Sequence, residues 1–236
     1  MTLDSTPAIR TLALDTSSVK GSVCLLEGRE VVAEFRLCSL ETHSARLLRS
    51  LDFLLEAAGW DLSGLGLIVA GLGPGSFTGI RIGIATALGL AQTLGIPFAG
   101  ASGLDALAHR AGLPDGRLDV VADARRSQVY HAEYLRRNGR VRRMSRPALF
   151  HPQDLRAHVR SGRTSVIGEG AQLYAKELGL TRTGWPRLIE AELFLSADLG
   201  RLALARKRSW RRGDELRAEP LYIRPPDARR ARRMQA

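Results

Sequence analysis

The sequence predicts an α/β fold made of two similar halves, each a mixed β-sheet with helices packed on it. Over roughly the first hundred residues the patterns run strand, strand, strand, helix, strand, helix, strand. Residues 11–37 and 118–144 share one layout: a strand ending in Asp, a polar turn, a strand, a glycine turn and a strand. A repeated supersecondary plan of this kind indicates a duplicated fold.

The first half opens with a predicted antiparallel meander. Three apolar runs, separated by a polar turn and a glycine turn, lie at residues 9–14, 21–26 and 31–37. Thr42 or Ser44 can cap the helix that follows, and Gly59 ends it. The helix has apolar positions with a 3.6-residue period: Leu47, Leu48, Leu51, Leu54, Leu55 and Ala58.

A buried strand is predicted at residues 65–70 and is followed by a glycine-rich loop at residues 71–79. A second helix then runs to about Leu94, and a short strand follows at residues 96–99. Small residues recur every four positions along this helix, at Gly79, Gly83 and Ala87. Another backbone can therefore approach closely. That backbone belongs either to the same subunit, for example to the leucine-rich helix, or to a partner protein.

The second half repeats the opening of the first. Its predicted strands are residues 118–122, 128–135, 140–144 and 165–167, and its predicted helices are residues 153–159, 171–178 and 196–207. An extended segment, residues 219–226, comes last. We place the boundary near residue 105, which gives halves of residues 1–105 and 106–236.

Composition and charge set limits on the class of protein. No apolar run approaches the ~18 residues of a membrane span, and the first ten residues lack a signal core, so we expect a cytoplasmic protein without membrane contact. Cys24 and Cys38 are expected to be free, buried thiols. The net charge is +11, and residues 201–236 hold 12 basic and 4 acidic groups. This basic tail either attracts nucleic-acid phosphates or keeps the protein soluble.

Two turns form a candidate ligand loop: Asp15, Thr16 and Ser17 in the first, and Gly73, Pro74, Gly75 and Ser76 in the second. A strand-to-helix loop can hold an anion with its backbone N–H groups, but glycines also serve tight turns alone. The matching turn of the second half, residues 123–126, has arginines where a phosphate loop offers Gly and Thr. A two-loop ATP clamp is therefore disfavoured, and we expect no cofactor.

No sequence motif predicts catalysis or a local metal site. The chain has five histidines, His43, His109, His131, His151 and His158, and no two have the spacing that places imidazoles on one helical face. No GxSxG elbow is present, and neither cysteine has an adjacent base. We therefore expect no catalytic residue and no metal ligand.

Several segments together resemble the bacterial TsaB (YeaZ) family over nearly the whole chain. They are residues 12–17, His43 with Leu47 and Leu48, residues 73–83 (Gly-Pro-Gly-Ser-Phe-Thr-Gly-Ile-Arg-Ile-Gly), residues 123–125 with Val129 and Tyr130, and residues 219–224. The resemblance implies two RNase-H-like halves of the actin/Hsp70/sugar-kinase superfamily. It also implies a non-catalytic subunit that activates the catalytic subunit TsaD, which with the ATPase TsaE places a threonylcarbamoyl group on the tRNA adenosine next to the anticodon.

The chain departs from TsaD where TsaD-like proteins bind metal. Their His-Leu-Glu-Gly-His stretch corresponds here to residues 103–107, so Gly103 and Leu107 stand at the positions of the two histidines. Neither side chain can bind a metal, which makes transfer by this chain alone chemically implausible.

In the resembled family, two helices of the first half pair with TsaD or with a second TsaB copy. The resemblance and the small-residue stripe together predict these partner-binding residues: His43, Leu47, Ser50, Phe53, Leu54, Gly79, Arg81, Ile82, Gly83, Thr86, Ala87 and Leu90. On this basis, Gly83→Leu should block partner binding and leave the monomer folded. The alternative function is an ATP-binding kinase or ATPase with Asp15 and Asp123 around a metal–nucleotide complex.

Overall fold

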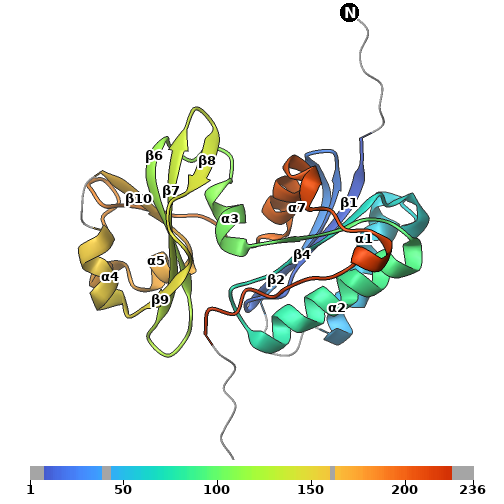
Figure 1. Cartoon of the computed structure of the whole chain (residues 1–236), viewed down its shortest axis with the longest axis horizontal. Helices are drawn as coiled ribbons and strands as arrows, with labels where there is room; N and C mark the ends of the chain where they lie inside the picture. The colour runs from blue at the N-terminus through green and yellow to red at the C-terminus, as the bar shows by residue number, and fades with distance from the viewer. Residues whose placement is uncertain (1–7, 39–43, 160–162, 225–236) are drawn as a thin grey trace, which may run out of the picture.

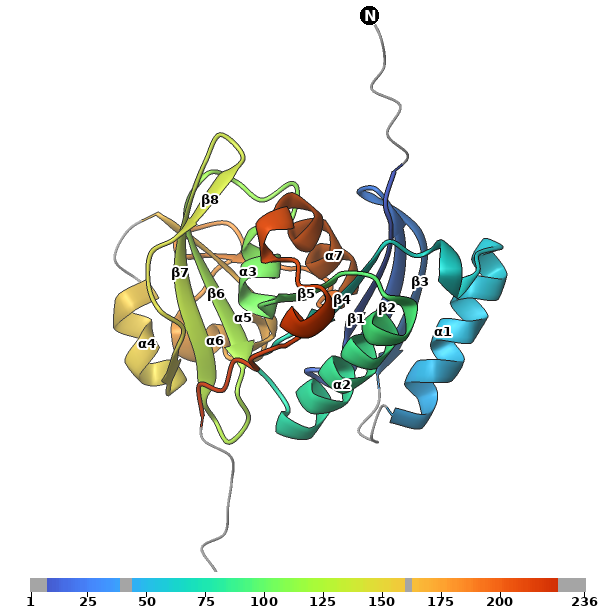
Figure 2. The same cartoon turned by 45° about the vertical axis from the view of Figure 1, so that its right-hand side comes forward.

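The computed structural model describes residues 8–38, 44–159 and 163–224, and shows two halves side by side, each built on one sheet (Figures 1 and 2). The first sheet has the order β3-β2-β1-β4-β5. Its strands are β1 (Arg10–Asp15), β2 (Lys20–Glu27), β3 (Glu30–Cys38), β4 (Leu67–Gly71) and β5 (Phe98–Ala101). β1, β2 and β3 form the predicted antiparallel meander, while β4 and β5 continue the sheet in parallel.

The second sheet has the order β11-β10-β6-β7-β8. Its strands are β6 (Gly116–Asp123), β7 (Val129–Arg137), β8 (Arg140–Arg143), β10 (Thr164–Ile167) and β11 (Arg187–Ile189), and β9 (Ala148–Phe150) pairs with β7 outside this order. The pairing directions match those of the first sheet strand for strand. The two halves therefore have one topology, which confirms the predicted duplication.

Helices cover both faces of the first sheet. On one face lie α1 (Ser44–Ala58) and α2 (Phe77–Leu94), whose inward leucines, isoleucines and alanines form one core with Leu12, Leu25 and Ile68. Their apolar stripes explain this placement, because a helix with one apolar face must bury it. The opposite face is covered by α7 (Ser196–Ala205), which packs on Ala13, Cys24 and Leu67.

The second sheet is covered in the same way. α4 (Pro152–Val159), α5 (Glu169–Leu173) and α6 (Ala175–Leu178) lie on one face, in a core that includes Val121, Val129 and Leu155. α3 (Gly103–Ala108) lies on the other, where Leu104 and Leu107 join the second core. The remaining short elements are three 3-10 helices, η1 (Leu62–Gly64), η2 (Lys207–Ser209) and η3 (Gly213–Glu215).

The expected division into residues 1–105 and 106–236 needs a correction. Residue 105 falls inside α3, which contributes Ala106 to the core under the first sheet and Leu107 to the core of the second. α7 packs on β1, β2 and β4, so the chain returns from the second half to the first. Leu221 then donates a backbone hydrogen bond to Leu72 O. The first half therefore includes the C-terminal segment.

Two expectations from composition also change. Both cysteines are free, but only Cys24 is buried, and burial raises the pKa of its thiol to about 12; Cys38 is exposed. α2 is long and apolar enough to cross a membrane by length and composition, which the sequence reading did not expect. Its inward residues pack on the first sheet, so it is a core helix.

Candidate functional site

Each half ends its first strand in an aspartate that shapes the following turn. The Asp15 carboxylate accepts a hydrogen bond from Ser17 N at 3.0 Å, and the Asp123 carboxylate accepts one from Arg125 N at 2.9 Å. Both are Asx turns, in which a side chain bonds the backbone two residues on. The duplication thus extends from topology to individual hydrogen bonds.

A cleft of about 610 Å³ lies between the two halves. Both aspartate turns contribute to it, together with the glycine loop, α3 and the C-terminal segment. The lining includes Thr16 to Ser18, Pro74 to Gly79, Asp123 to Arg126, Gly168, Glu169 and Leu221 to Arg224. This volume lies in the range of small-molecule sites.

The predicted ligand loop exists, but its two parts pack against each other. Ser76 N donates to Ser17 O at 2.7 Å, and Gly79 N donates to the Ser76 hydroxyl at 3.2 Å. A Cβ atom built on Gly75 would lie 2.1 Å from Ser17 O. Glycine is therefore required here by the close approach of two backbones, and these N–H groups are already used inside the protein.

The ATP-binding alternative places Asp15 beside a metal–nucleotide complex, and the geometry does not favour it. Asp15 is only 2% exposed and does not line the cleft. A Cβ atom on Gly71 would lie 2.7 Å from its Oδ1, so the carboxylate is enclosed by the β4 backbone. Asp123 does line the cleft, where it forms an ion pair with Arg125 at 3.5 Å.

The C-terminal segment runs from the first half to the second (Figure 2), and its residues Leu221 to Arg224 line the cleft. On the first half, Arg81 Nε donates to the Tyr222 hydroxyl at 3.0 Å and its guanidinium lies 3.8 Å from the Phe77 ring centroid. On the second half, Arg224 donates to Gln128 Oε1. Arg81, predicted to bind a partner, therefore already holds this segment, although its side chain is exposed.

Half of the predicted partner-binding residues are buried in the core of this chain, where they pack against other parts of the same chain. They are Leu47, Ser50, Leu54, Gly79, Gly83 and Ala87. The small-residue stripe fits the turn after β1: a Cβ atom would lie 2.1 Å from Thr16 O at Gly79 and 2.3 Å from Thr16 Oγ1 at Gly83. Gly83→Leu would therefore disturb the fold itself, contrary to the expectation of an intact monomer.

Other predicted residues do reach the surface. Phe53 is 61% exposed, and Leu48, five positions earlier on α1, is 52% exposed. On α2, Ile82, Thr86 and Leu90 are half-buried. One third of the α2 residues are fully buried and another third are half-buried. We call the surface formed by Leu48, Phe53, Ile82, Thr86 and Leu90 the α1–α2 face. The remaining predicted residue, His43, lies outside the described residues.

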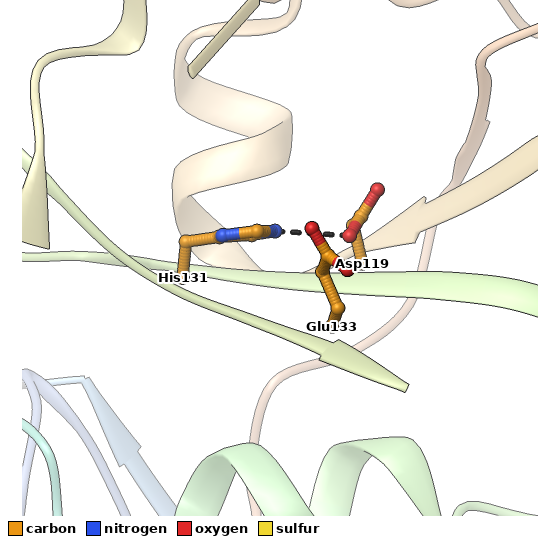
Figure 3. Close-up of side chains that lie close together, drawn as sticks. All are labelled: Asp119, His131 and Glu133. Carbon is orange, nitrogen blue, oxygen red and sulfur yellow. Dashed lines mark hydrogen bonds and ion pairs between the residues drawn. The ribbon is translucent and has the colours of Figure 1, made fainter. Parts of the chain in front are cut away.

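A polar cluster on the second sheet was not predicted from the sequence (Figure 3). His131 Nε2 lies 2.9 Å from Asp119 Oδ1, both side chains are 4% exposed, and Glu133 points to the same place from β7. Within the part of the chain that the structure describes, this is the one group of three such side chains close enough to share a cation. Arg117 lies 4.0 Å from Glu133. The His131–Asp119 hydrogen bond gives the buried carboxylate an internal partner.

Comparisons with known proteins agree with this architecture. A family model described as "TsaD: tRNA N6-adenosine threonylcarbamoyltransferase" matches residues 38–182. The chain is 35% identical over 227 residues to the tRNA threonylcarbamoyladenosine biosynthesis protein TsaB of Escherichia coli (strain K12), which covers 92% of this chain and 95% of that protein. It is also 33% identical over 184 residues to TsaB of Bacillus subtilis; this match covers 68% of this chain and 80% of that protein.

Solved structures give the same result. YeaZ from Pseudomonas aeruginosa superposes with a TM-score of 0.72 and 29% identity, covering 88% of this chain and 97% of that one. Component A of (R)-2-hydroxyglutaryl-CoA dehydratase from Acidaminococcus fermentans shares only the fold. It superposes with a TM-score of 0.50 and 13% identity, and the match covers 85% of this chain and 100% of that one. The fold is thus the duplicated actin/Hsp70/sugar-kinase fold, as the sequence resemblance implied. The chain belongs to the TsaB (YeaZ) family and is a homologue of the TsaB proteins of tRNA threonylcarbamoyladenosine biosynthesis.

Proposed function

We propose that this chain is a non-catalytic subunit in tRNA threonylcarbamoyladenosine modification that holds and activates a TsaD-like catalytic subunit through its α1–α2 face. The observation that carries the proposal is an uncovered apolar surface on the first half. Phe53 and Leu48 are mostly exposed, and on α2 the apolar side chains of Ile82 and Leu90 are only half-buried. Exposed apolar surface of this kind marks protein–protein contact.

The side chains in and around the cleft support a role without chemistry. At the positions that correspond to the TsaD histidines, a Cβ atom on Gly103 would lie 3.1 Å from Leu195 Cδ1, and Leu107 is 4% exposed in the second core. Asp15 is enclosed away from the cleft. The residues that a metal-dependent transferase needs at these places are replaced by packing groups.

Two further partners belong to the same proposal. A TsaE-like ATPase would act on the assembled pair, and a homodimer through the α1–α2 face is the competing arrangement when the catalytic subunit is absent. The same apolar surface serves either partner, so the two assemblies exclude each other. Association with tRNA is then indirect, through the catalytic subunit, or direct, through basic residues of this chain.

The interface is tested by placing charges on the α1–α2 face. Leu48→Glu with Phe53→Glu should weaken binding to the TsaD-like subunit at least about 30-fold, because a charge would have to be buried where an apolar anchor is expected. Isothermal titration between the two purified proteins measures the dissociation constant. The matched control is Leu173→Glu, which removes a leucine that is 60% exposed on α5. Undiminished affinity of the double variant would rule out this face.

A further inference from the structure

The β7–β8 hairpin is the most basic surface segment of the second half. Residues 136–146 contain six arginines and no acidic residue. The chain has 32 arginines in 236 residues, so an even distribution would place one or two in such a stretch. The general arginine content therefore does not account for this concentration.

Strand register places three of these arginines on one face with a fourth from the next strand. Arg137 is paired directly with Arg140, and Leu135 is paired with both Arg142 on β8 and Arg117 on β6. Directly paired residues, and residues two apart along a strand, share a face of the sheet. All four side chains are exposed. We call Arg117, Arg137, Arg140 and Arg142 the hairpin arginine face.

Within the described ranges, most of this positive charge has no counter-charge. Arg117 lies 4.0 Å from Glu133, but Arg137, Arg140 and Arg142 have no ion pair or side-chain hydrogen bond with any residue of the described ranges. Like charges directly opposite each other across strands are destabilising. Arg137 and Arg140 therefore repel each other in the free protein, and a bound polyanion would reduce this repulsion.

Three arginines close to this face have contacts inside the protein. Arg136 donates to Ala108 O and is buried, which lowers the pKa of its guanidinium. Arg143 and Arg206 both contact Asp105, at 3.4 and 3.2 Å. These contacts fasten the hairpin to α3 and to the end of α7, so the hairpin arginine face stands on an anchored support.

The hairpin presents its charges rigidly and away from the proposed partner surface. Asn138 and Gly139 have φ values of 50° and 73°, which fit a tight two-residue hairpin turn, and Asn138 N donates to Asp115 at 2.6 Å. In both views β8 lies in the other half of the molecule from α1 and α2 (Figures 1 and 2). A partner on the α1–α2 face would leave the hairpin uncovered.

We propose that the hairpin arginine face binds the phosphate backbone of structured RNA. The inference rests on the proposed function in one respect only: a subunit of a tRNA-modifying assembly meets such RNA. Guanidinium groups bind phosphate bidentately. The deep, narrow major groove of A-form RNA does not admit side chains for base reading, so contacts to phosphates give binding that is independent of sequence and sensitive to salt.

The test measures binding of an unmodified tRNA transcript to the full-length chain by fluorescence anisotropy over a range of salt concentrations. Arg137→Gln/Arg140→Gln/Arg142→Gln should weaken binding at least about 10-fold near 0.1 M salt. It should also make the slope of log affinity against log salt shallower by about 2 to 3, because each phosphate contact contributes about 0.7 to 0.9. The control, with the same change in net charge, is Arg156→Gln/Arg182→Gln/Arg187→Gln on the α4 and β11 side. It should change affinity less than about 3-fold.

Three results would overturn the proposal: no salt-dependent RNA binding by the wild-type chain, unchanged binding by the hairpin variant, or equal losses in both triple variants. Thermal unfolding confirms that each variant is folded, since exposed substitutions change stability little. Binding to the TsaD-like subunit is measured on the same preparations. A wild-type chain that binds this subunit but no RNA refutes only the RNA surface, and one that binds RNA but no subunit refutes only the proposed function.

Discussion

Gly79→Ala should destabilise the protein by about 3 kcal/mol, although it adds a single methyl group to a helix. The new Cβ atom would lie 2.1 Å from Thr16 O, a backbone atom that cannot rotate away. The Thr16 hydroxyl also donates to Gly79 O at 2.7 Å, so moving the helix outward breaks that bond. Overpacking against backbone costs more than against a flexible side chain.

Gly89 provides the matched control on the same helix. It is exposed, and a Cβ atom there meets nothing within 4 Å. Gly89→Ala should therefore stabilise the protein by about 0.5 to 1 kcal/mol, as alanine loses less backbone entropy in a helix. Urea unfolding of both variants gives the comparison. Similar effects at the two positions would show that α2 does not contact the turn after β1.

His131→Phe should cost roughly 3 to 5 kcal/mol, because it removes the hydrogen-bond partner of the buried Asp119 carboxylate. Phenylalanine keeps an aromatic ring at this position. It can therefore keep the edge-on contact that His131 makes with Phe150, whose ring centroid lies 5.7 Å away. The loss is therefore assigned to the unpaired carboxylate. Unfolding free energies from urea titration measure it.

The double variant Asp119→Val/His131→Phe separates pairing from packing. Replacing both members of a buried polar pair by apolar groups of similar size is often nearly neutral, so most of the lost stability should return. A double-mutant cycle yields the coupling energy. If the two single effects simply add, the His131–Asp119 contact contributes nothing and the cluster in Figure 3 has another basis.

Local sequence patterns were enough to predict much of the fold. The meander, the leucine-rich helix and the repeated strand-to-aspartate turn follow from period, turn residues and apolar runs, and all appear in the structure. The short elements α3, β9 and β11 were missed. Their few residues give no measurable period, and their positions depend on packing between distant segments.

The direction of a helix face was harder to predict than its existence. The spacing of Gly79 and Gly83 correctly indicated a close backbone approach, but nothing in a four-residue period says which backbone approaches. The structure shows that it is the turn at Thr16. Likewise, Asp119 and His131 are 12 positions apart and meet only through the β6–β7 register, so a search for local histidine pairs could not find them.

The central claim is that this chain supplies a binding surface and no transfer chemistry. The most direct measurement is tRNA threonylcarbamoylation reconstituted from the purified chain, a TsaD-like subunit and a TsaE-like ATPase, with ATP and an activated threonylcarbamoyl donor added. The account predicts no modification by the chain alone, full activity when all components are present, and loss of activity when Leu48→Glu and Phe53→Glu are combined. Threonylcarbamoylation of tRNA by the pure chain without the other subunits would contradict it.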